Sequence, residues 1–162
     1  MRLDRFTQKA QEALLEAQQQ ASEYHHSQIE PEHLLYALLS QTDGVVPQVV
    51  QKLGQNPHAL LEQTNQVLTR KPRAYGAAVQ VGISSVLQNV LDKAQTEAEA
   101  MKDEYVSTEH LLLALTDPGA GAVANLLASS GITRDAVLRV LAAIRGSQRV
   151  TTPTPESTYQ AL

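Results

Sequence analysis

Two nearly identical heptapeptides, "EHLLYAL" at residues 32–38 and "EHLLLAL" at residues 109–115, lie 77 positions apart, counted from Glu32 to Glu109. With that offset held fixed and no gap, other residues match as well, among them Leu14 and Leu91, Ala17 and Ala94, Gln18 and Gln95, Gly44 and Gly121, and Gly54 and Gly131. A unit repeated in this way is too small to bury its apolar face alone. We therefore expect two copies that pack together about a pseudo-twofold axis.

Each copy is expected to form four helices. Apolar residues recur at spacings of three and four after Thr7 and after Ser84, which predicts a long amphipathic helix capped by each hydroxyl. Pro31 marks a second, short helix, because proline is favoured at the first helical position. Gly54 and Gly131 predict the ends of the third helices. In chain order, the expected helices cover about 7–23, a short stretch from 31, 47–53, 57–70, a stretch from 84, a short stretch from 108, 122–129 and 133–145.

The predicted fold class is all-α, with two pseudo-twofold four-helix repeats packed into one globular domain and followed by an extended linker. The domain covers residues 1–146, with repeat one at about 4–70 and repeat two at about 81–146. Between the copies, "KPRAYGAAVQVG" contains too much Gly and Pro for a helix. Residues 147–162, with their Thr and Pro, predict a semi-stiff tether toward another part of a longer protein.

Composition and charge exclude several classes of function. A net charge of −4 and a pI near 5.7, without a Lys/Arg cluster, argue against nucleic-acid binding. The absence of cysteine excludes a disulfide framework and a thiolate nucleophile. No apolar run approaches the roughly 18–20 residues of a membrane span. GxSxG, P-loop and GxGxxG motifs are missing. We expect a soluble cytoplasmic segment that is not an enzyme and holds no cofactor or metal.

The carboxylates that head the two blocks allow two interpretations. Glu32 and Glu109 fall in the first turn of a short helix, where unpaired N–H groups favour negative charge by about 0.3–1 kcal/mol, so a purely structural role explains them. Alternatively, each copy brings its hydroxyl, Thr7 or Ser84, and its carboxylate together with two helix N-termini at one edge. Such an edge can hold backbone or cationic groups of another chain. The sequence leaves both interpretations open.

The histidines support a weaker hypothesis. His33 and His110 follow the two glutamates and point about 100° away from them, so we expect each to be half-buried with a satisfied ring nitrogen. His25 and His26, with Glu30 and His33 downstream, form a ligand-like cluster, and metal-assisted chemistry at the three histidines is a third class of function. These residues lack the HExxH spacing of metalloproteases, and the second copy has other residues in place of the first two, so we expect no metal site.

Five stretches carry a resemblance to a known family: "MRLDRFTQKAQEAL" (1–14), "IEPEHLLYALL" (29–39), "RKPRAYG" (70–76), "EYVSTEHLLLAL" (104–115) and "IRGSQRV" (144–150). Through them, and over essentially its whole length, the chain resembles the amino-terminal Clp repeat domain of the Hsp100/ClpB disaggregase chaperones.

The resemblance implies a mobile domain, tethered to a hexameric AAA+ ATPase, that takes part in the stress response by recruiting unfolded or aggregated protein for threading. The partners would be such clients, the chain's own ATPase modules and, as a further candidate, an Hsp70-type cochaperone. The isolated domain would be a monomer, the parent a homohexamer, and ATP would bind only in modules outside this segment. The alternative is an adaptor-docking domain of the ClpC/ClpA type.

The resemblance also implies site residues. Thr7, Asp103 and Glu109 match positions implicated in substrate engagement, although Asp103 taken alone predicts a solvated loop acid. Glu32 and Ser84 follow by internal symmetry, and in the ClpC branch such paired sites bind phosphorylated arginine. His26 stands where symmetry would require a partner for Asp103, so the two edges are expected to differ. A hydrophobic groove is predicted from apolar residues that lie off the helical stripes: Phe6, Leu15, Val79, Val81 and Val86.

Overall fold

The chain folds into eight α-helices, two short 3₁₀-helices (labelled η) and two short strands over the residues that the computed structural model describes, which are 3–75, 81–146 and 148–156. The elements of the first copy are η1 (Leu3–Arg5), α1 (Gln8–Glu23), β1 (Gln28–Ile29), α2 (Pro31–Ser40), α3 (Val45–Lys52) and α4 (Pro57–Thr69). Those of the second copy are β2 (Gly82–Ile83), α5 (Ser85–Ala100), α6 (Thr108–Leu115), η2 (Pro118–Ala120), α7 (Ala122–Ser129) and α8 (Arg134–Arg145). The predicted all-α class is confirmed.

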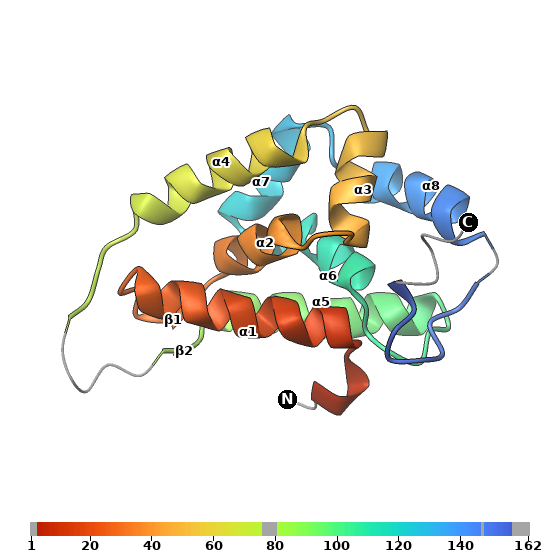
Figure 1. Cartoon of the computed structure of the whole chain (residues 1–162), viewed down its shortest axis with the longest axis horizontal. Coiled ribbons are helices and arrows are strands. Elements are labelled where there is room, and N and C mark those ends of the chain that lie inside the picture. The colour runs from red at the N-terminus through yellow and green to blue at the C-terminus, as the bar shows by residue number, and fades with distance from the viewer. Residues whose placement is uncertain (1–2, 76–80, 147, 157–162) are drawn as a thin grey trace.

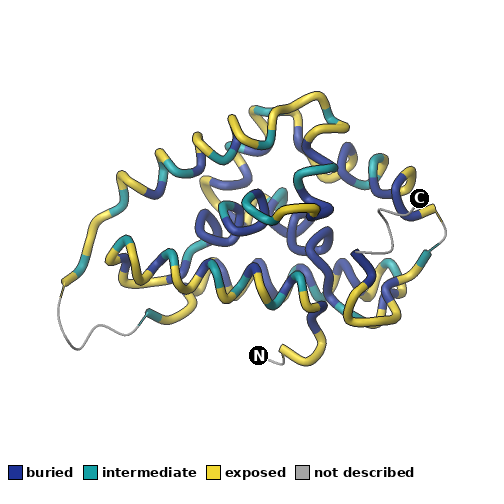
Figure 2. The backbone as a smooth tube through the Cα atoms, viewed as in Figure 1, coloured by how far each residue is buried: buried dark blue, intermediate teal, exposed yellow. Residues whose placement is uncertain are grey.

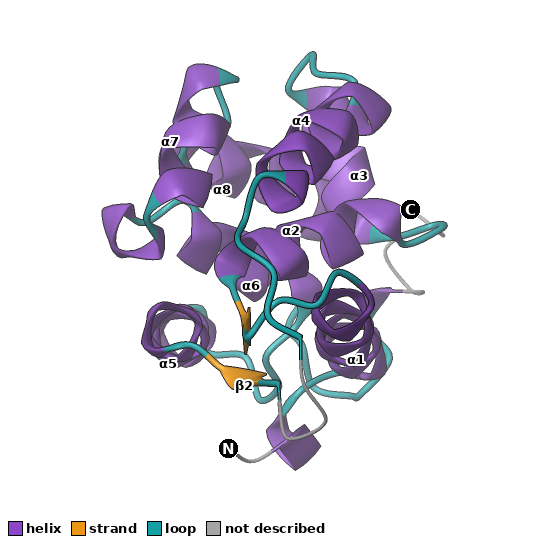
Figure 3. Ribbon diagram, turned by 90° about the vertical axis from the view of Figure 1, so that its left-hand side faces the viewer, coloured by secondary structure: helices purple, strands orange, loops and turns teal. Residues whose placement is uncertain are grey.

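The helices are arranged in three layers (Figure 1, Figure 3). Helices α1 and α5 run in opposite directions and form one outer layer, and α2 and α6 lie over them in the middle. Helices α3, α4, α7 and α8 cover the other side. The tube in Figure 2 is most continuously buried along α2 and α6.

The repeated heptapeptides form this central layer. All eight residues of α6 are buried, and α2 buries every residue except Tyr36 and Ser40. Helices that are apolar on all sides need cover on all sides, which explains why the most similar part of the two copies is the innermost part. The core around them is aliphatic, built from Leu, Val, Ile and Ala, with Phe6 as its one aromatic residue.

The pseudo-twofold relation is confirmed by pairs of equivalent hydrogen bonds. The Thr7 N–H donates to the Val106 carbonyl at 2.9 Å, and at the equivalent positions the Ser84 N–H donates to the Ile29 carbonyl at 3.1 Å. Phe6 forms a parallel bridge with Val106, and Ile83 pairs in parallel with Ile29 in the β1–β2 sheet. Each of these contacts joins one copy to the other, so the copies are linked twice at symmetric places.

The helix ends follow the predicted chemistry closely. Thr7 Oγ1 accepts from the Ala10 N–H, and Ser84 Oγ accepts from the Leu87 N–H, so both hydroxyls cap as expected. Gly54 and Gly131 have φ of +82° and +75° and follow the last turns of α3 and α7.

Helix α3 begins at Val45, two residues before the expected start. Pro47 then lies in the first turn of the helix. Its missing N–H has no consequence there, because the first N–H groups of a helix have no partner within it.

The described residues after α8 lie against the domain. Residues 148–155 are irregular, as their Thr and Pro content predicts, but the segment folds back onto the domain. Val150 is fully buried and Glu156 is 1% exposed. The segment's Pro153 carbonyl accepts from the N–H of Gln8, the first residue of α1, and its Val150 carbonyl accepts from the N–H of Glu104, between α5 and α6. Composition alone does not predict these bonds. Within the described part of the chain, no helix has the length and apolarity to cross a membrane.

Candidate functional site

The candidate site residues lie at two edges that the crossed copies build together. The first edge is where α2 and α5 begin, with Glu32 and Ser84. The second edge is where α1 and α6 begin, with Thr7 and Glu109. We had expected each copy to combine its own hydroxyl and carboxylate. Instead, the bridges between the copies place the hydroxyl of one copy beside the short helix of the other.

At the second edge, Asp103 and His110 form a buried pair. His110 Nδ1 accepts the Ser107 N–H at 2.8 Å, so the other ring nitrogen carries the proton, and Nε2 lies 2.7 Å from Asp103 Oδ2. Asp103 Oδ1 accepts from Arg145 Nη2 at 2.7 Å and from the Val150 N–H at 2.9 Å. Burial alone would raise the pKa of Asp103. The hydrogen bonds from His110, Arg145 and Val150 and the charge of Arg145 outweigh burial and lower it to about 2.

Two expectations for this pair are corrected. His110 is fully buried and uses both ring nitrogens, and the carboxylate of Asp103 is not a solvated loop acid, because its side chain is 0% exposed. The turn that carries Asp103 folds its carboxylate inward, against a histidine seven positions later and an arginine from the last helix.

Glu109 is the least satisfied group of the second edge. Its side chain is 0% exposed, and Arg145 Nη1 lies 3.3 Å from its Oε2. Within the described residues, neither of its carboxylate oxygens accepts a hydrogen bond. Arg145 therefore neutralises two buried carboxylates, Asp103 and Glu109, at once. Sequence reasoning missed Arg145. The available signal was an arginine on the buried face of α8 at the position that Leu68 occupies in the first copy.

The first edge keeps this geometry with different chemistry. His33 Nδ1 accepts the Glu30 N–H at 2.8 Å, and its Nε2 lies 2.7 Å from Nδ1 of His26, which takes the place of Asp103. Burial, together with the charges of His26 and Lys71, lowers the pKa of His33 to about 4. Burial and Lys71 also lower the pKa of His26. Glu32 pairs with Lys71 Nζ at 2.6 Å. The expected difference between the edges is thus present in their charges.

The histidine cluster of the metal hypothesis does not come together. His26 and His33 bond each other, while His25 has φ of +58° and packs its ring against Tyr75. Within the described residues, no three His, Cys, Asp or Glu side chains are grouped so that they could hold a metal ion.

An apolar groove lies along α1 beside the β1–β2 pair. Its apolar lining consists of Leu3, Leu14, Leu15, Ile29, Val81, Ile83 and Leu87. Of the predicted groove residues, Leu15 and Val81 line it. Val86 is 36% exposed but lies outside this lining, and Val79 lies outside the described residues. Phe6 was placed there wrongly, because its bridge to Val106 buries it completely.

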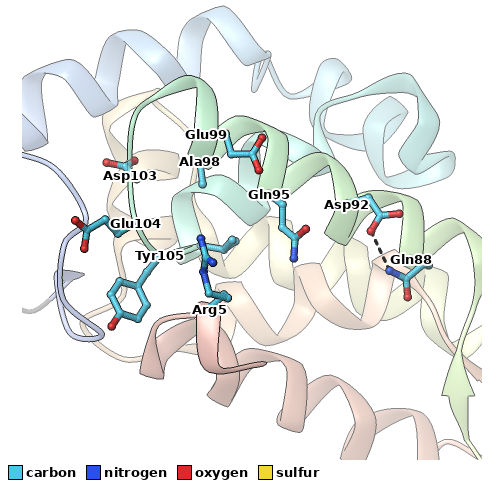
Figure 4. Close-up of a pocket in the computed structure, with 10 residues that line it drawn as sticks. Arg5, Gln88, Asp92, Gln95, Ala98, Glu99, Asp103, Glu104 and Tyr105 are labelled. Carbon is cyan, nitrogen blue, oxygen red and sulfur yellow. Dashed lines mark hydrogen bonds between the residues drawn. The ribbon is translucent and has the colours of Figure 1, made fainter. Parts of the chain in front are cut away.

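A second groove occupies the symmetric place along α5, and it is polar (Figure 4). Asp92 replaces Leu15, Glu99 replaces Ser22, and Arg5 replaces Gly82. In Figure 4, Arg5 reaches from η1 toward α5, and Gln88 donates to Asp92 at 3.0 Å. The duplicated fold therefore presents one apolar groove and one charged groove.

Comparison with known proteins agrees with this architecture. The model of the Clp repeat (R) N-terminal domain family matches residues 5–130. The chain belongs to this family. It is an N-terminal domain of the ClpB/Hsp100 chaperone type. Chaperone protein ClpB of Bacillus cereus is 39% identical over 165 aligned residues, which include 100% of this chain but 19% of that protein. The chain therefore spans about a fifth of the length of the curated relatives that it matches.

Solved structures agree on the fold of this Clp repeat domain. The Hsp104 N-terminal domain from Candida albicans superimposes with a TM-score of 0.82 at 24% identity, covering 93% of this chain and 98% of that one. A ClpV N-domain, solved as a complex with a VipB peptide, superimposes with a TM-score of 0.71 at 19% identity, covering 90% of each chain. At these identities the likeness concerns the fold alone.

Proposed function

We propose that this Clp repeat domain recruits unfolded or aggregated polypeptide for an ATP-dependent disaggregase. The observation that carries the proposal is the exposed apolar groove along α1. Leu15 is 58% exposed, Leu3 48% and Ile83 42%, so three of the five exposed large hydrophobic residues in the described part of the chain line this one groove. Exposed apolar surface of this kind is typical of sites that bind other proteins.

The groove suits a client without fixed structure. An unfolded chain offers apolar side chains without a defined shape, and the groove offers aliphatic side chains flanked by the amides of Gln11 and Gln18, without charged groups. Burying about 400 Å² of apolar surface at about 25 cal/mol/Å² yields roughly 10 kcal/mol. The entropy of association cancels about 4–15 kcal/mol of this gain. Binding is therefore expected to be micromolar or weaker.

The edge residues are proposed as polar anchors near the groove. Thr7 and Glu109 are fully buried and Asp103 is 9% exposed, so a client reaches them only after residues 148–156 move aside. Glu32 at 6% and Ser84 at 3% exposure are proposed as the symmetric pair of anchors. Ser84 follows directly after Ile83, which lines the groove.

The parent protein is proposed from the ClpB relatives, whose length extends far beyond this chain. In such a parent, this segment acts without catalysis and passes the client to its own AAA+ ATPase modules, which bind ATP and form a cytoplasmic homohexamer. Several tethered copies gain avidity although each binds weakly. An Hsp70-type cochaperone is proposed as a further partner of the parent.

Docking of a folded adaptor or a defined peptide is the second candidate function. A ClpV N-domain of the same fold was solved with a VipB peptide, which favours this candidate. The two functions differ in selectivity, because an adaptor site binds one partner tightly whereas a recruiting groove binds many unfolded chains weakly.

The test replaces Leu15 by Asp, the residue type at the equivalent position of the polar groove. We expect about tenfold weaker binding of a permanently unfolded client, because a charge in the groove cannot be buried there without loss. The thermal midpoint should stay within about 3 °C, since exposed substitutions have small effects. Val86→Asp is the matched control outside the groove and should leave binding unchanged. Equal binding by all three chains, measured by fluorescence anisotropy, would refute the recruiting groove.

A further inference from the structure

The segment after α8 is bound at the second edge much as a separate peptide would be. The Val150 carbonyl accepts the Glu104 N–H at 2.7 Å, and the Val150 N–H donates to Asp103. Three residues further on, the Pro153 carbonyl accepts the N–H of Gln8, the first residue of α1, at 2.8 Å. The backbone of residues 150–153 is thus held by both copies at once.

The carboxylate of Glu156 completes this contact. Its Oε2 accepts from Thr7 Oγ1 at 2.8 Å and from the N–H of Thr108, the first residue of α6, at 3.2 Å. Glu156 is 1% exposed. The starts of α1 and α6 therefore converge on one segment and give it an N–H each, at the ends of helices where negative charge is favoured.

The hydrogen bonding of Glu156 in this contact is incomplete. Burial and the nearby charge of Glu109 raise the pKa of Glu156, whereas the bond from Thr7 lowers it. Glu156 Oε1 and Thr108 Oγ1 are buried without a hydrogen-bond partner among the described residues. Burying these two polar atoms without a hydrogen bond costs free energy, which reduces the net stabilisation that the Glu156 contact provides.

We propose that the second edge is a docking site for an extended acidic peptide that presents a backbone carbonyl three residues before its carboxylate. Residues 150–156 fill the site in cis and compete with such a peptide supplied in trans. This inference deepens the proposed function, because it names the polar segment that must leave before a client reaches Thr7 and Glu109. A segment tethered in the same chain acts at an effective concentration of the order of millimolar, so it competes strongly even when it binds weakly.

The test compares the 162-residue chain with its Glu156→Ala and Glu156→Gln variants. Both variants should lose hydrogen-exchange protection at the amides of Gln8 and Thr108, which the segment now holds. Glu104→Ala is the matched control, because it removes an equal charge from an exposed side chain beside the same segment. Unchanged protection in both Glu156 variants would overturn the proposal, and so would an equal loss in the control.

A synthetic peptide with the sequence of residues 150–158, "VTTPTPEST", with blocked ends, tests the site in trans. We expect it to shift the Gln8 and Thr108 resonances of the Glu156→Ala chain and to bind the wild-type chain at least tenfold more weakly, since the wild-type segment competes. A peptide with Gln in place of Glu156 should bind about tenfold less well. Equal affinity for both chains, or for both peptides, would refute the docking site.

The result is separable from that of the proposed function, because no unfolded client is present in this experiment. If Leu15→Asp loses client binding but the peptide binds the wild-type and Glu156→Ala chains equally, only the inference about the second edge is refuted. If the peptide competes with residues 150–156 but Leu15→Asp binds the client as well as the wild-type chain does, only the proposal of the recruiting groove is refuted.

Discussion

At the first edge, a lysine from the connecting segment neutralises Glu32, whereas at the second edge an arginine on α8 neutralises both Asp103 and Glu109. The lysine side chain is 26% exposed, but the arginine side chain is 3% exposed. The backbone and the histidine positions are equivalent at the two edges. The two copies therefore share a hydrogen-bonded frame but carry different charges inside it.

The histidine pairs show the same division. His33 faces another histidine and has a pKa lowered to about 4, mainly by burial, while His110 faces the carboxylate of Asp103. One edge therefore favours a neutral pair and the other an ion-paired cluster. Exchanging or removing single residues of the two edges separates these contributions.

The largest effect is expected from Arg145→Met. Loss of the arginine leaves the buried carboxylate of Glu109 without an ion-pair partner and removes one of the three partners of Asp103. This should lower the free energy of unfolding by about 3–5 kcal/mol. Lys71→Met at the first edge should cost roughly 1 kcal/mol, because its ion pair is partly exposed. Urea unfolding at neutral pH measures both changes. Similar losses in the two variants would show that the edges do not differ in the way their burial indicates.

The next effect concerns the pH dependence of stability. The folded pKa of His33 lies below its ordinary value of 6.5, so the unfolded chain binds the proton first. The stability contribution is therefore complete above pH 6.5 and is lost as the pH falls toward 4, by an amount on the order of 3 kcal/mol. His26→Asp gives His33 the partner that His110 has and should remove most of this loss.

Urea unfolding of both chains at about pH 7 and about pH 4.5 provides the measurement. Apart from residue 26 itself, the titrating groups other than His33 are common to the two chains, so the wild-type chain is the control for them. If the two chains lose equal stability on acidification, then the buried histidine pair is not the cause.

The smallest effect separates the two hydroxyl caps. Ser84→Ala should cost about 1 kcal/mol, the usual value of a helix N-cap. Thr7→Ala should cost about 1 kcal/mol more, because Thr7 Oγ1 also donates to Glu156. In a Glu156→Ala background the two substitutions should cost the same. A difference that persists in that background would place the additional contribution of Thr7 outside its bond to Glu156.

The features of the fold that depend on residues close together in the sequence could be predicted. Thr7 and Ser84 cap their helices through N–H groups three residues away, and Gly54 and Gly131 end theirs through their own backbone. The duplication was visible because the central helices cannot vary much without loss of packing. These features all involve contacts within a few positions or within the repeat itself.

The composition of the candidate site could not be predicted in the same way. Whether Thr7 faces Glu32 or Glu109 depends on how the copies cross, and periodicity within one copy contains no information about that crossing. Phe6 was misplaced for this reason, because its buried position comes from its bridge to Val106. The position of Glu156 likewise depends on donors far away in the sequence, on α1 and α6.

The crossing of the copies also has a consequence for synthesis of the chain. A nascent polypeptide that has released only residues 3–75 contains α1 and α2, yet it lacks Ile83 for one bridge and Val106 for the other. Both bridges close loops of many residues, and this entropy is lost before any contact compensates for it. We therefore expect the first copy to complete its fold only after the second copy has been synthesised, and each copy to lose these contacts when the other unfolds.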